Sequence, residues 1–277
     1  MLRTGLYGRV GDVENSCNGR LNCQMLGSDS GSVARLFNSC NGAEPCAFLG
    51  QTGKVGSVEY SCNHGRSCVL LGGQGAIGNL SNSCNELDAC PNLGSNSVQF
   101  GGRVGDINDS CNGGLSCIAL SYNGGFIGNI TQSCNNMNAC SELGSDRGKA
   151  GEIDDSCNRE ESCNGVATGS EGSIGSIQSS CNASNACRGA GAVEPIFSDL
   201  KFCCNTDFEC VSLTEDTLPA ECLPRTKVRM LCTRSVLLSI HLFSYSTCMN
   251  LTPQQAAKRV FQRILRSHKL DEVHARQ

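Results

Sequence analysis

Apolar residues return at three fixed positions of a repeated unit between residues 8 and 210. Two of these positions lie seven and four residues before a recurring Ser-Cys-Asn triplet, as Val10 and Val13 lie before Cys17. The third lies nine residues after that cysteine, as at Leu26. Many of the apolar residues are β-branched and lie next to glycine, and no apolar period of helical length appears. The pattern therefore favours short strands.

The repeat is regular enough to predict the architecture. Triplets recur at steps of 22 to 27 residues, and in all nine copies a second cysteine follows the first after six residues. A glycine stands nine residues before the first cysteine in the eight regular copies. Each unit has too few apolar residues for a core of its own, whereas units stacked in register close a continuous narrow core. We therefore expect an all-β fold in which residues 8–210 form a parallel β-helix, or β-solenoid, of about nine rungs.

The main alternative is a leucine-rich repeat, which shares a period of about 20–29 residues and an asparagine after a short strand. Val10, Val13 and Asn18 fit that pattern, but Asn15 stands where a further apolar residue is expected. The β-helix is therefore favoured. Five extra residues between the fourth and fifth copies, around residues 95–99, fit a loop at one corner.

The cysteines can pair within a unit or between equal positions on neighbouring rungs, and the spacing of rungs permits both. Loop entropy does not separate the two schemes. With nine copies, pairing between rungs would leave a thiol unpaired in each column, so we predict one disulfide per rung. The predicted bonds are Cys17–Cys23, Cys40–Cys46, Cys62–Cys68, Cys84–Cys90, Cys111–Cys117, Cys134–Cys140, Cys157–Cys163, Cys181–Cys187 and Cys204–Cys210, with Cys203–Cys222 closing the last rung. Cys232 and Cys248 remain as a weaker pair in the tail.

Metal binding is the competing use of so many cysteines. Zinc sites usually place cysteines about two to four residues apart, often with histidine. Here the spacing is six residues, and His64 is the only histidine of the array. We therefore predict no metal site and no cofactor.

An asparagine follows the first cysteine in every copy. We expect a structural role, because asparagine tolerates left-handed backbone at a corner and stacked amides can hydrogen-bond from rung to rung. The hydroxyl of Ser16 and its equivalents is expected to support the same turn. The predicted asparagine ladder consists of Asn18, Asn41, Asn63, Asn85, Asn112, Asn135, Asn158, Asn182 and Asn205.

Composition indicates the compartment. The chain has 22 cysteines among 277 residues, a usage typical of disulfide scaffolds in oxidising environments, so we expect an extracellular or cell-surface location. Candidate glycosylation sequons lie at Asn79, Asn108 and Asn129, while Asn182 belongs to the ladder and Asn250 to the tail. Residues 1–7 are too short and polar for a signal peptide, so we expect the natural array to begin further upstream.

Charge and motifs exclude several functions. The formal net charge of −4 gives no basis for nucleic-acid binding. No nucleophile, zinc-hydrolase or P-loop motif occurs, so we predict no catalytic residues. A mixed polar column five residues before the first cysteine offers oxygen atoms that suit weak Ca²⁺ binding, although a solvated face is favoured. It includes Asp12, Asn79, Asp106, Asn129 and Glu152.

Residues 211–277 differ from the array. They carry 10 Lys and Arg against 5 Asp and Glu, whereas residues 1–210 carry 12 against 21. We expect a cap or irregular segment over 211–251 and an amphipathic α-helix over 252–270, which begins with a capping box at Thr252. Contact with a membrane is possible only through this helix.

The unit G-x-I-G-x-I-x-x-S-C-N-x4-[AS]-C-x-x-L-G resembles the cysteine-rich SCN repeats of extracellular right-handed β-helix proteins of unicellular algae. The resemblance covers residues 8–210 and implies a surface or secreted location, but it brings no functional residues. We expect a non-enzymatic structural or adhesive protein whose partner is an extracellular glycan or a wall or matrix protein. The alternative is a polysaccharide-binding protein or a polysaccharide lyase or hydrolase.

Overall fold

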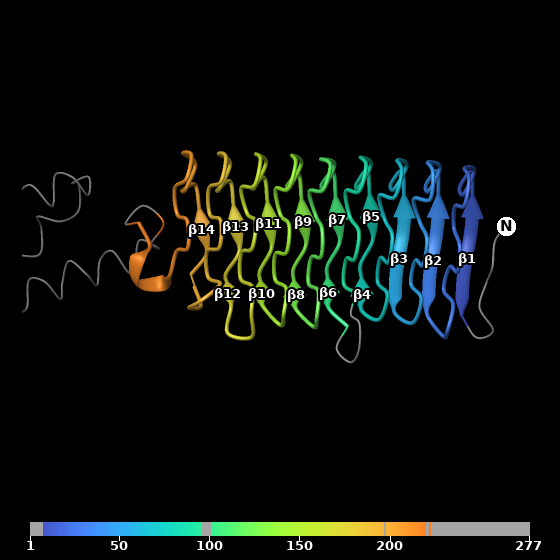
Figure 1. Cartoon of the computed structure of the whole chain (residues 1–277), viewed down its shortest axis with the longest axis horizontal. Coiled ribbons are helices and arrows are strands. Elements are labelled where there is room, and N and C mark those ends of the chain that lie inside the picture. Colours follow the sequence, from blue (N-terminus) through green and yellow to red (C-terminus); the bar gives the residue numbers. More distant parts are fainter. Residues whose placement is uncertain (1–7, 96–100, 197, 220–221, 223–277) are drawn as a thin grey trace, which may run out of the picture. The chain divides into compact units, whose positions relative to one another are not determined.

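The computed structural model describes residues 8–95, 101–196, 198–219 and 222. These residues form an all-β parallel solenoid of about eight turns, with the nine cysteine-bearing copies stacked in sequence order (Figure 1). The predicted fold class and the single disulfide per rung are confirmed, and the leucine-rich repeat is not the fold. The chain divides into two units after Cys222, and all described residues belong to the first. The helix expected over 252–270, Cys232, Cys248 and the corner loop at 96–99 lie outside the described residues.

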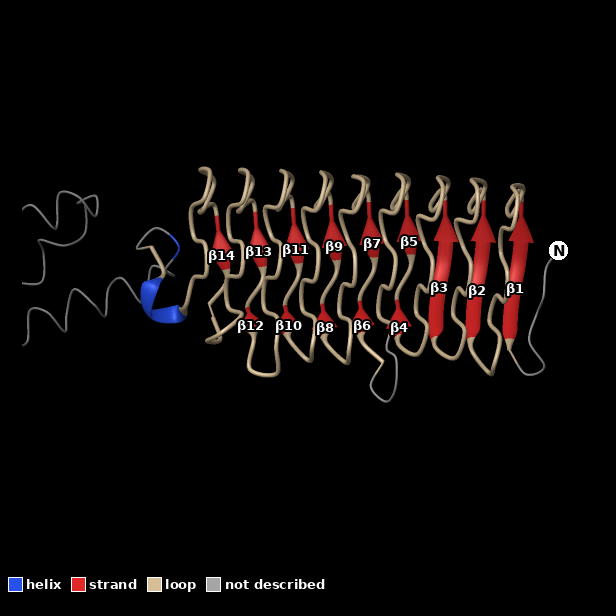
Figure 2. Cartoon of the chain, viewed as in Figure 1, coloured by secondary structure: helices blue, strands red, loops and turns tan. Residues whose placement is uncertain are grey.

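Each rung contributes strand to a single parallel sheet (Figure 2). In the first three rungs the strand is continuous over six residues, as β1 (Arg9–Glu14), β2 (Ser32–Phe37) and β3 (Lys54–Glu59). From the fourth rung the same stretch divides into two short strands that continue β3 as two columns. The first column comprises β4 (Ala76–Ile77), β6 (Arg103–Val104), β8 (Phe126–Ile127), β10 (Lys149–Ala150) and β12 (Ser173–Ile174). The second column comprises β5 (Leu80–Ser81), β7 (Ile107–Asn108), β9 (Ile130–Thr131), β11 (Ile153–Asp154), β13 (Ile177–Gln178) and β14 (Leu200–Lys201).

In part of the stack, the division coincides with a side-chain hydrogen bond to the residue after the central glycine. The backbone N–H of Asn79 donates to a side-chain oxygen of Asp106 in the next rung rather than to a backbone carbonyl. The backbone N–H of Asp106 donates in the same way to Asn129. At these steps a side-chain oxygen replaces a backbone acceptor. The same bond from Ser57 N to Asn79 lies at the step where the pairing of β3 passes to β4 and β5 separately.

The core is a stack of like residues held in register. Val33 pairs with Val55 in the first column, and Leu36 pairs with Val58 in the second. The third apolar column, from Leu26 to Leu143, is fully buried beside them. Because each rung adds three apolar side chains and a buried disulfide, the core is thin and continuous along the stack.

The third side of each rung is built from turns rather than strands. Along this side of the first rung, alternate residues take positive φ, at Leu21, Cys23, Met25 and Gly27. Left-handed backbone is costly for residues other than glycine, by roughly 1–2 kcal/mol each. Backbone bonds between rungs hold it, such as the bond from Gly27 N to Leu49 O at 2.9 Å.

One expectation about the corner is wrong. The asparagine after the first cysteine is not among the residues with positive φ in any described copy. The left-handed positions are the first cysteine itself, with φ of 56° at Cys111, and the residue two before it, with φ of 49° at Asp109. Asparagine is therefore required at this corner for its amide group and not for its backbone freedom.

The two ends of the described array differ. At the first rung, the side chain of Val13 is 41% exposed. At the last rung, the chain continues through Leu213 and the 3-10 helix η1 (Glu215–Thr217) to Cys222, and Leu213, Leu218 and Cys222 are buried. The described part of the segment after residue 210 thus adds buried residues and a disulfide at this end.

Candidate binding face

The outer face of the sheet presents equivalent side chains in columns along the stack. The first outward column lies eight residues before the first cysteine, and its members are paired from rung to rung by the parallel register. This column consists of Arg9, Ser32, Lys54, Ala76, Arg103, Phe126, Lys149 and Ser173. Such a column is the candidate binding surface that repetition itself creates.

The next outward column contains the oxygen ligands considered for Ca²⁺. Asn79 Oδ1 accepts the backbone N–H of Ser57 at 2.9 Å, and Asp106 Oδ1 accepts that of Asn79 at 2.7 Å. Asn129 Oδ1 accepts the N–H of Asp106 at 2.9 Å. These three oxygen atoms already serve the backbone of the preceding rung, which opposes the calcium interpretation. Within the described residues, the clusters with metal-ligand geometry consist of cysteines alone.

The nine asparagines that follow the first cysteines lie in one column and bond to one another. Asn135 is representative: its Oδ1 accepts the N–H of Asn112 at 3.1 Å, and its own N–H donates to Asn158 Oδ1 at 3.2 Å. Its Nδ2 donates to the carbonyl of Asp109, 3.1 Å away in the preceding rung. From Asn41 to Asn205, each amide thus joins its rung to the preceding one through both of its polar atoms.

A second ladder is formed by the serine that precedes each first cysteine. The hydroxyl of Ser133 donates to the carbonyl of Thr131 at 2.7 Å and accepts the N–H of Ser156 in the next rung at 3.0 Å. Ser133 is fully buried. The hydroxyl does more than support its own turn, because it satisfies a buried backbone donor of the following rung.

Replacing this hydroxyl tests the serine ladder. We expect Ser133→Ala to lower the free energy of unfolding by about 1–3 kcal/mol, because it leaves the Ser156 amide buried without an acceptor. Denaturant unfolding of the oxidised protein measures the change. Thr131→Ser, on the outer face of the same rung, keeps the Asn129 sequon; it is the control and is expected to change stability by less than about 0.5 kcal/mol. If the two substitutions lowered the free energy of unfolding equally, the serine ladder would make no specific contribution to stability.

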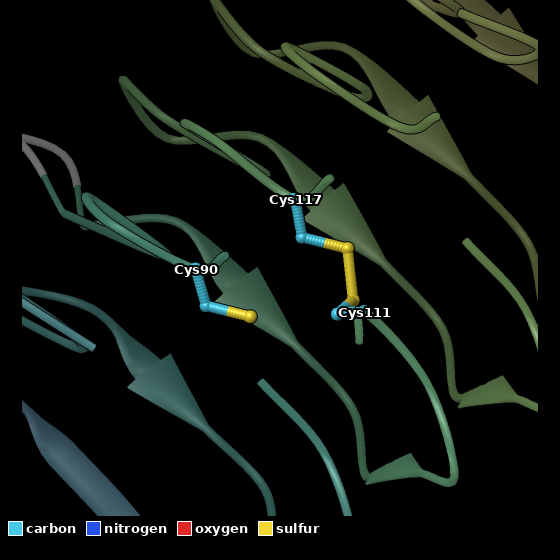
Figure 3. A group of neighbouring side chains, drawn as sticks. All are labelled: Cys90, Cys111 and Cys117. Carbon is cyan, nitrogen blue, oxygen red and sulfur yellow. A yellow bond between two sulfur atoms is a disulfide. The ribbon is translucent and has the colours of Figure 1, made fainter. Parts of the chain in front are cut away.

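The disulfides form a third column, inside the rungs. Nine of them join cysteines six residues apart, from Cys17–Cys23 to Cys204–Cys210, with Cα–Cα distances of 5.5–5.7 Å. The tenth joins Cys203 to Cys222. Figure 3 shows the sulfur of Cys90 directed toward the Cys111–Cys117 bond of the next rung, and the three sulfur atoms lie within 4.8 Å of one another.

This proximity is stacking of disulfides and not a metal site. Every described cysteine is in a disulfide, so none of the described sulfur atoms is a free thiolate that could bind zinc. At the last rung, Cys203 replaces the ladder serine. Its N–H donates to Ser180 Oγ at 3.1 Å, while its sulfur bonds to Cys222. The serine ladder therefore ends in a covalent bond to the segment beyond the array.

The sequons differ in what their side chains already contact. Asn79 and Asn129 are exposed, and their bonds to the backbone use Oδ1, not the nitrogen to which a glycan is attached. Asn108 is half-buried, and its sequon serine, Ser110, is a fully buried member of the serine ladder. In Asn182 both polar atoms of the amide are used in the asparagine ladder.

A shallow groove of about 220 Å³ lies at a corner of the middle rungs. Its lining includes the polar residues Gln51, Thr52, Asn92 and Ser95, together with Tyr122. Thr52 is two residues before Lys54 of the first outward column, so the groove adjoins the column in sequence. Amides, hydroxyls and one aromatic ring give this corner hydrogen-bonding groups without charge.

No known protein family, curated protein or solved structure matches the chain. The geometry itself defines its class, a cysteine-rich β-solenoid with a repeat of about 23 residues and a disulfide in each rung. The ten disulfides indicate an oxidising, extracellular type of environment. Among the described residues there is no helix whose length and apolar character would let it cross a membrane.

Proposed function

We propose that this chain is a non-enzymatic extracellular or cell-surface protein, structural or adhesive, that presents a repetitive binding face. The observation that carries the proposal is the use made of its polar side chains. The asparagines, the buried serines and the described cysteines join one rung to the next or close a rung on itself. Side chains that would otherwise be available for chemistry maintain the register of the stack.

The outward columns supply the adhesive part of the proposal. Equivalent residues recur at the spacing of the rungs, roughly 4.8 Å, along one face. A regular, rigid array of this kind suits a partner that is itself repetitive, such as a glycan or a wall or matrix polymer. The resemblance to the SCN repeats of algal surface proteins supports the same location.

The first test is the fate of the protein in cells. After expression through a secretory route, we expect retention in the surface or matrix fraction, with the disulfides of residues 17–222 intact on non-reducing peptide mapping. The same chain expressed in a reducing cytosol serves as the control and is expected to carry free thiols. Secreted material that stays entirely in the medium and binds no surface polymer would contradict the adhesive function.

Release of reducing ends from a panel of polysaccharides is measured in parallel. The non-enzymatic proposal predicts none above the level of heat-inactivated protein. Depolymerisation of any substrate would replace the proposal with the enzymatic alternative, a polysaccharide lyase or hydrolase.

A further inference from the structure

Charge in the first outward column alternates with a period of two rungs, which the repeat unit alone does not require. Cations stand on the first, third, fifth and seventh rungs, at Arg9, Lys54, Arg103 and Lys149. Uncharged residues occupy the rungs between them. Alternation keeps like charges off directly paired positions, where they would destabilise the sheet. It also leaves a straight row of cations two rungs apart, at a spacing of roughly 9.6 Å.

These four cations are available to a ligand. All four are exposed. Over the described residues, no ion pair involves any of them, whereas other basic residues are paired, as Arg66 is with Asp88 and Arg188 with Glu161. At 0.1 M salt the Debye length is about 10 Å, so cations at this spacing repel one another weakly while each can contact its own anion.

The surroundings of the row add a contact for sugar rings. Phe126 lies in the same column between Arg103 and Lys149, and its side chain is 49% exposed. An exposed phenyl ring on a polar face offers an apolar platform on which the apolar face of a pyranose can pack. The uncharged groove includes Thr52, two residues before Lys54 of the row in sequence.

The neighbouring acidic side chains do not cover the row. Asp12, Asp106 and Glu152 lie three residues further along their rungs, where each strand residue adds about 3.3 Å. One oxygen of Asp106 already accepts the N–H of Asn79. Exposed acidic residues also precede the column, at Asp29, Asp146 and Glu171. Acidic groups thus border the row on both sides, and a polyanion must lie along the row itself.

We propose that this row, Arg9, Lys54, Arg103 and Lys149 with Phe126, binds a linear acidic polysaccharide that carries one anionic group per disaccharide. Two rungs match the length of a disaccharide in an extended chain, so successive anions meet successive cations without bending either partner. Double-stranded DNA fits poorly, because each strand places one phosphate per about 3.4 Å of helix axis, a much denser charge than the row of cations. The inference rests on the proposed adhesive function and names the class of glycan for it.

Binding is tested with the secreted full chain and four probes. The probes are hyaluronan decasaccharide with one carboxylate per disaccharide, polygalacturonate with one per sugar, neutral chitin oligosaccharide, and duplex DNA. We expect hyaluronan to bind more tightly than the other three, with an affinity that falls as salt is added. Binding of the neutral oligosaccharide or of DNA as tight as that of hyaluronan, or the absence of hyaluronan binding, would overturn the inference.

Charge-matched variants locate the site. The variant R9Q/K54Q/R103Q/K149Q is expected to bind hyaluronan about thirtyfold more weakly, at about 0.5 kcal/mol for each exposed ionic contact. The control R20Q/R66Q/R159Q/R188Q removes the same charge from other parts of the array and is expected to change affinity less than about threefold by the same reasoning. Equal losses of hyaluronan affinity in the two variants would mean that binding depends on net charge alone and not on the row. Phe126→Ala, with no change of charge, should weaken binding of the glycan without altering its salt dependence.

The spacing itself is tested by K54A/A76K, which keeps four cations but breaks the two-rung period. We expect it to weaken hyaluronan binding severalfold and to leave polygalacturonate binding nearly unchanged. Unchanged hyaluronan affinity would remove the spacing argument. Retention in the surface fraction is measured for the fourfold glutamine variant as well. If this variant is retained like the unmodified protein, the row is not the adhesive site, while the proposed adhesive function stands.

Discussion

Full reduction of the disulfides is expected to unfold the array without any denaturant. In the loop-entropy description, each bond between cysteines six residues apart raises the free energy of the unfolded chain by about 2.4 kcal/mol. Nine such bonds together exceed the roughly 5–15 kcal/mol that separates folded from unfolded states in most domains. The core is thin, with three apolar side chains per rung, so apolar burial contributes too little to compensate for the loss of the disulfides. Far-ultraviolet circular dichroism and protease resistance, before and after reduction and alkylation, measure the loss.

The course of reduction should follow the position of each rung. Cys17 lies in the first rung and is only partly buried, whereas Cys111 and Cys117 are fully buried between neighbouring disulfides. Thiolate attack requires access to sulfur, so limited reductant should open Cys17–Cys23 before Cys111–Cys117. Mass mapping of alkylated cysteines gives the order, and protein treated with alkylating agent alone is the control. A reduced and alkylated chain with native dichroism and protease resistance would contradict the stabilising role of the bonds.

Regular spacing is what made the fold predictable from sequence. Val33, Val55 and Ile77 occupy the same place relative to their cysteines, and stacking in register pairs them directly. The pairing of Cys111 with Cys117 followed from parity, a property of the array that a single rung would not display. These features repeat, so each copy provides independent evidence for the same position.

The backbone conformation on the turn side of each rung could not be predicted in the same way. Residues such as Leu21 and Met25 adopt left-handed backbone although nothing in their side chains favours it. Their conformation is imposed by the disulfide of the rung and by backbone bonds to the next rung, which are tertiary contacts. The predicted left-handed asparagine failed for the same reason, since the bonded cysteine takes that conformation instead.

The polar columns were assigned to the right positions but not to all of their contacts. Asn79, Asp106 and Asn129 were candidate ion ligands because their oxygen atoms align on one face. In the folded array each turns an oxygen back to an amide of the preceding rung. The sequence pattern leaves open whether these oxygen atoms face solvent or the preceding rung, and the hydrogen bonds of the folded array show the second arrangement. The alternating cations, in contrast, are visible in sequence once the rungs are aligned, and the parallel register supplies that alignment.

Substitution of a central core leucine is expected to divide the array. Leu120 is fully buried in the third apolar column, between Leu93 and Leu143. Removing its side chain leaves a cavity within a narrow core, so Leu120→Ala should lower stability by about 3 kcal/mol. Each rung contacts only its neighbours, so the loss weakens the coupling between the rungs on either side. The two halves should then unfold separately in denaturant, with protease cleavage first near residue 120.

Position in the stack provides the control for this result. Leu213 lies beyond the second cysteine of the last rung, at the end of the same apolar column, and Leu213→Ala should loosen only that end without splitting the transition. Ile130→Val, a smaller truncation in the same central region, should cost about 0.5–1.5 kcal/mol and keep a single transition. A single cooperative transition for Leu120→Ala, with cleavage spread over the whole chain, would mean that coupling extends beyond nearest neighbours. The cooperative unit would then be larger than a single disulfide-closed rung, because a disulfide within one rung cannot couple distant rungs.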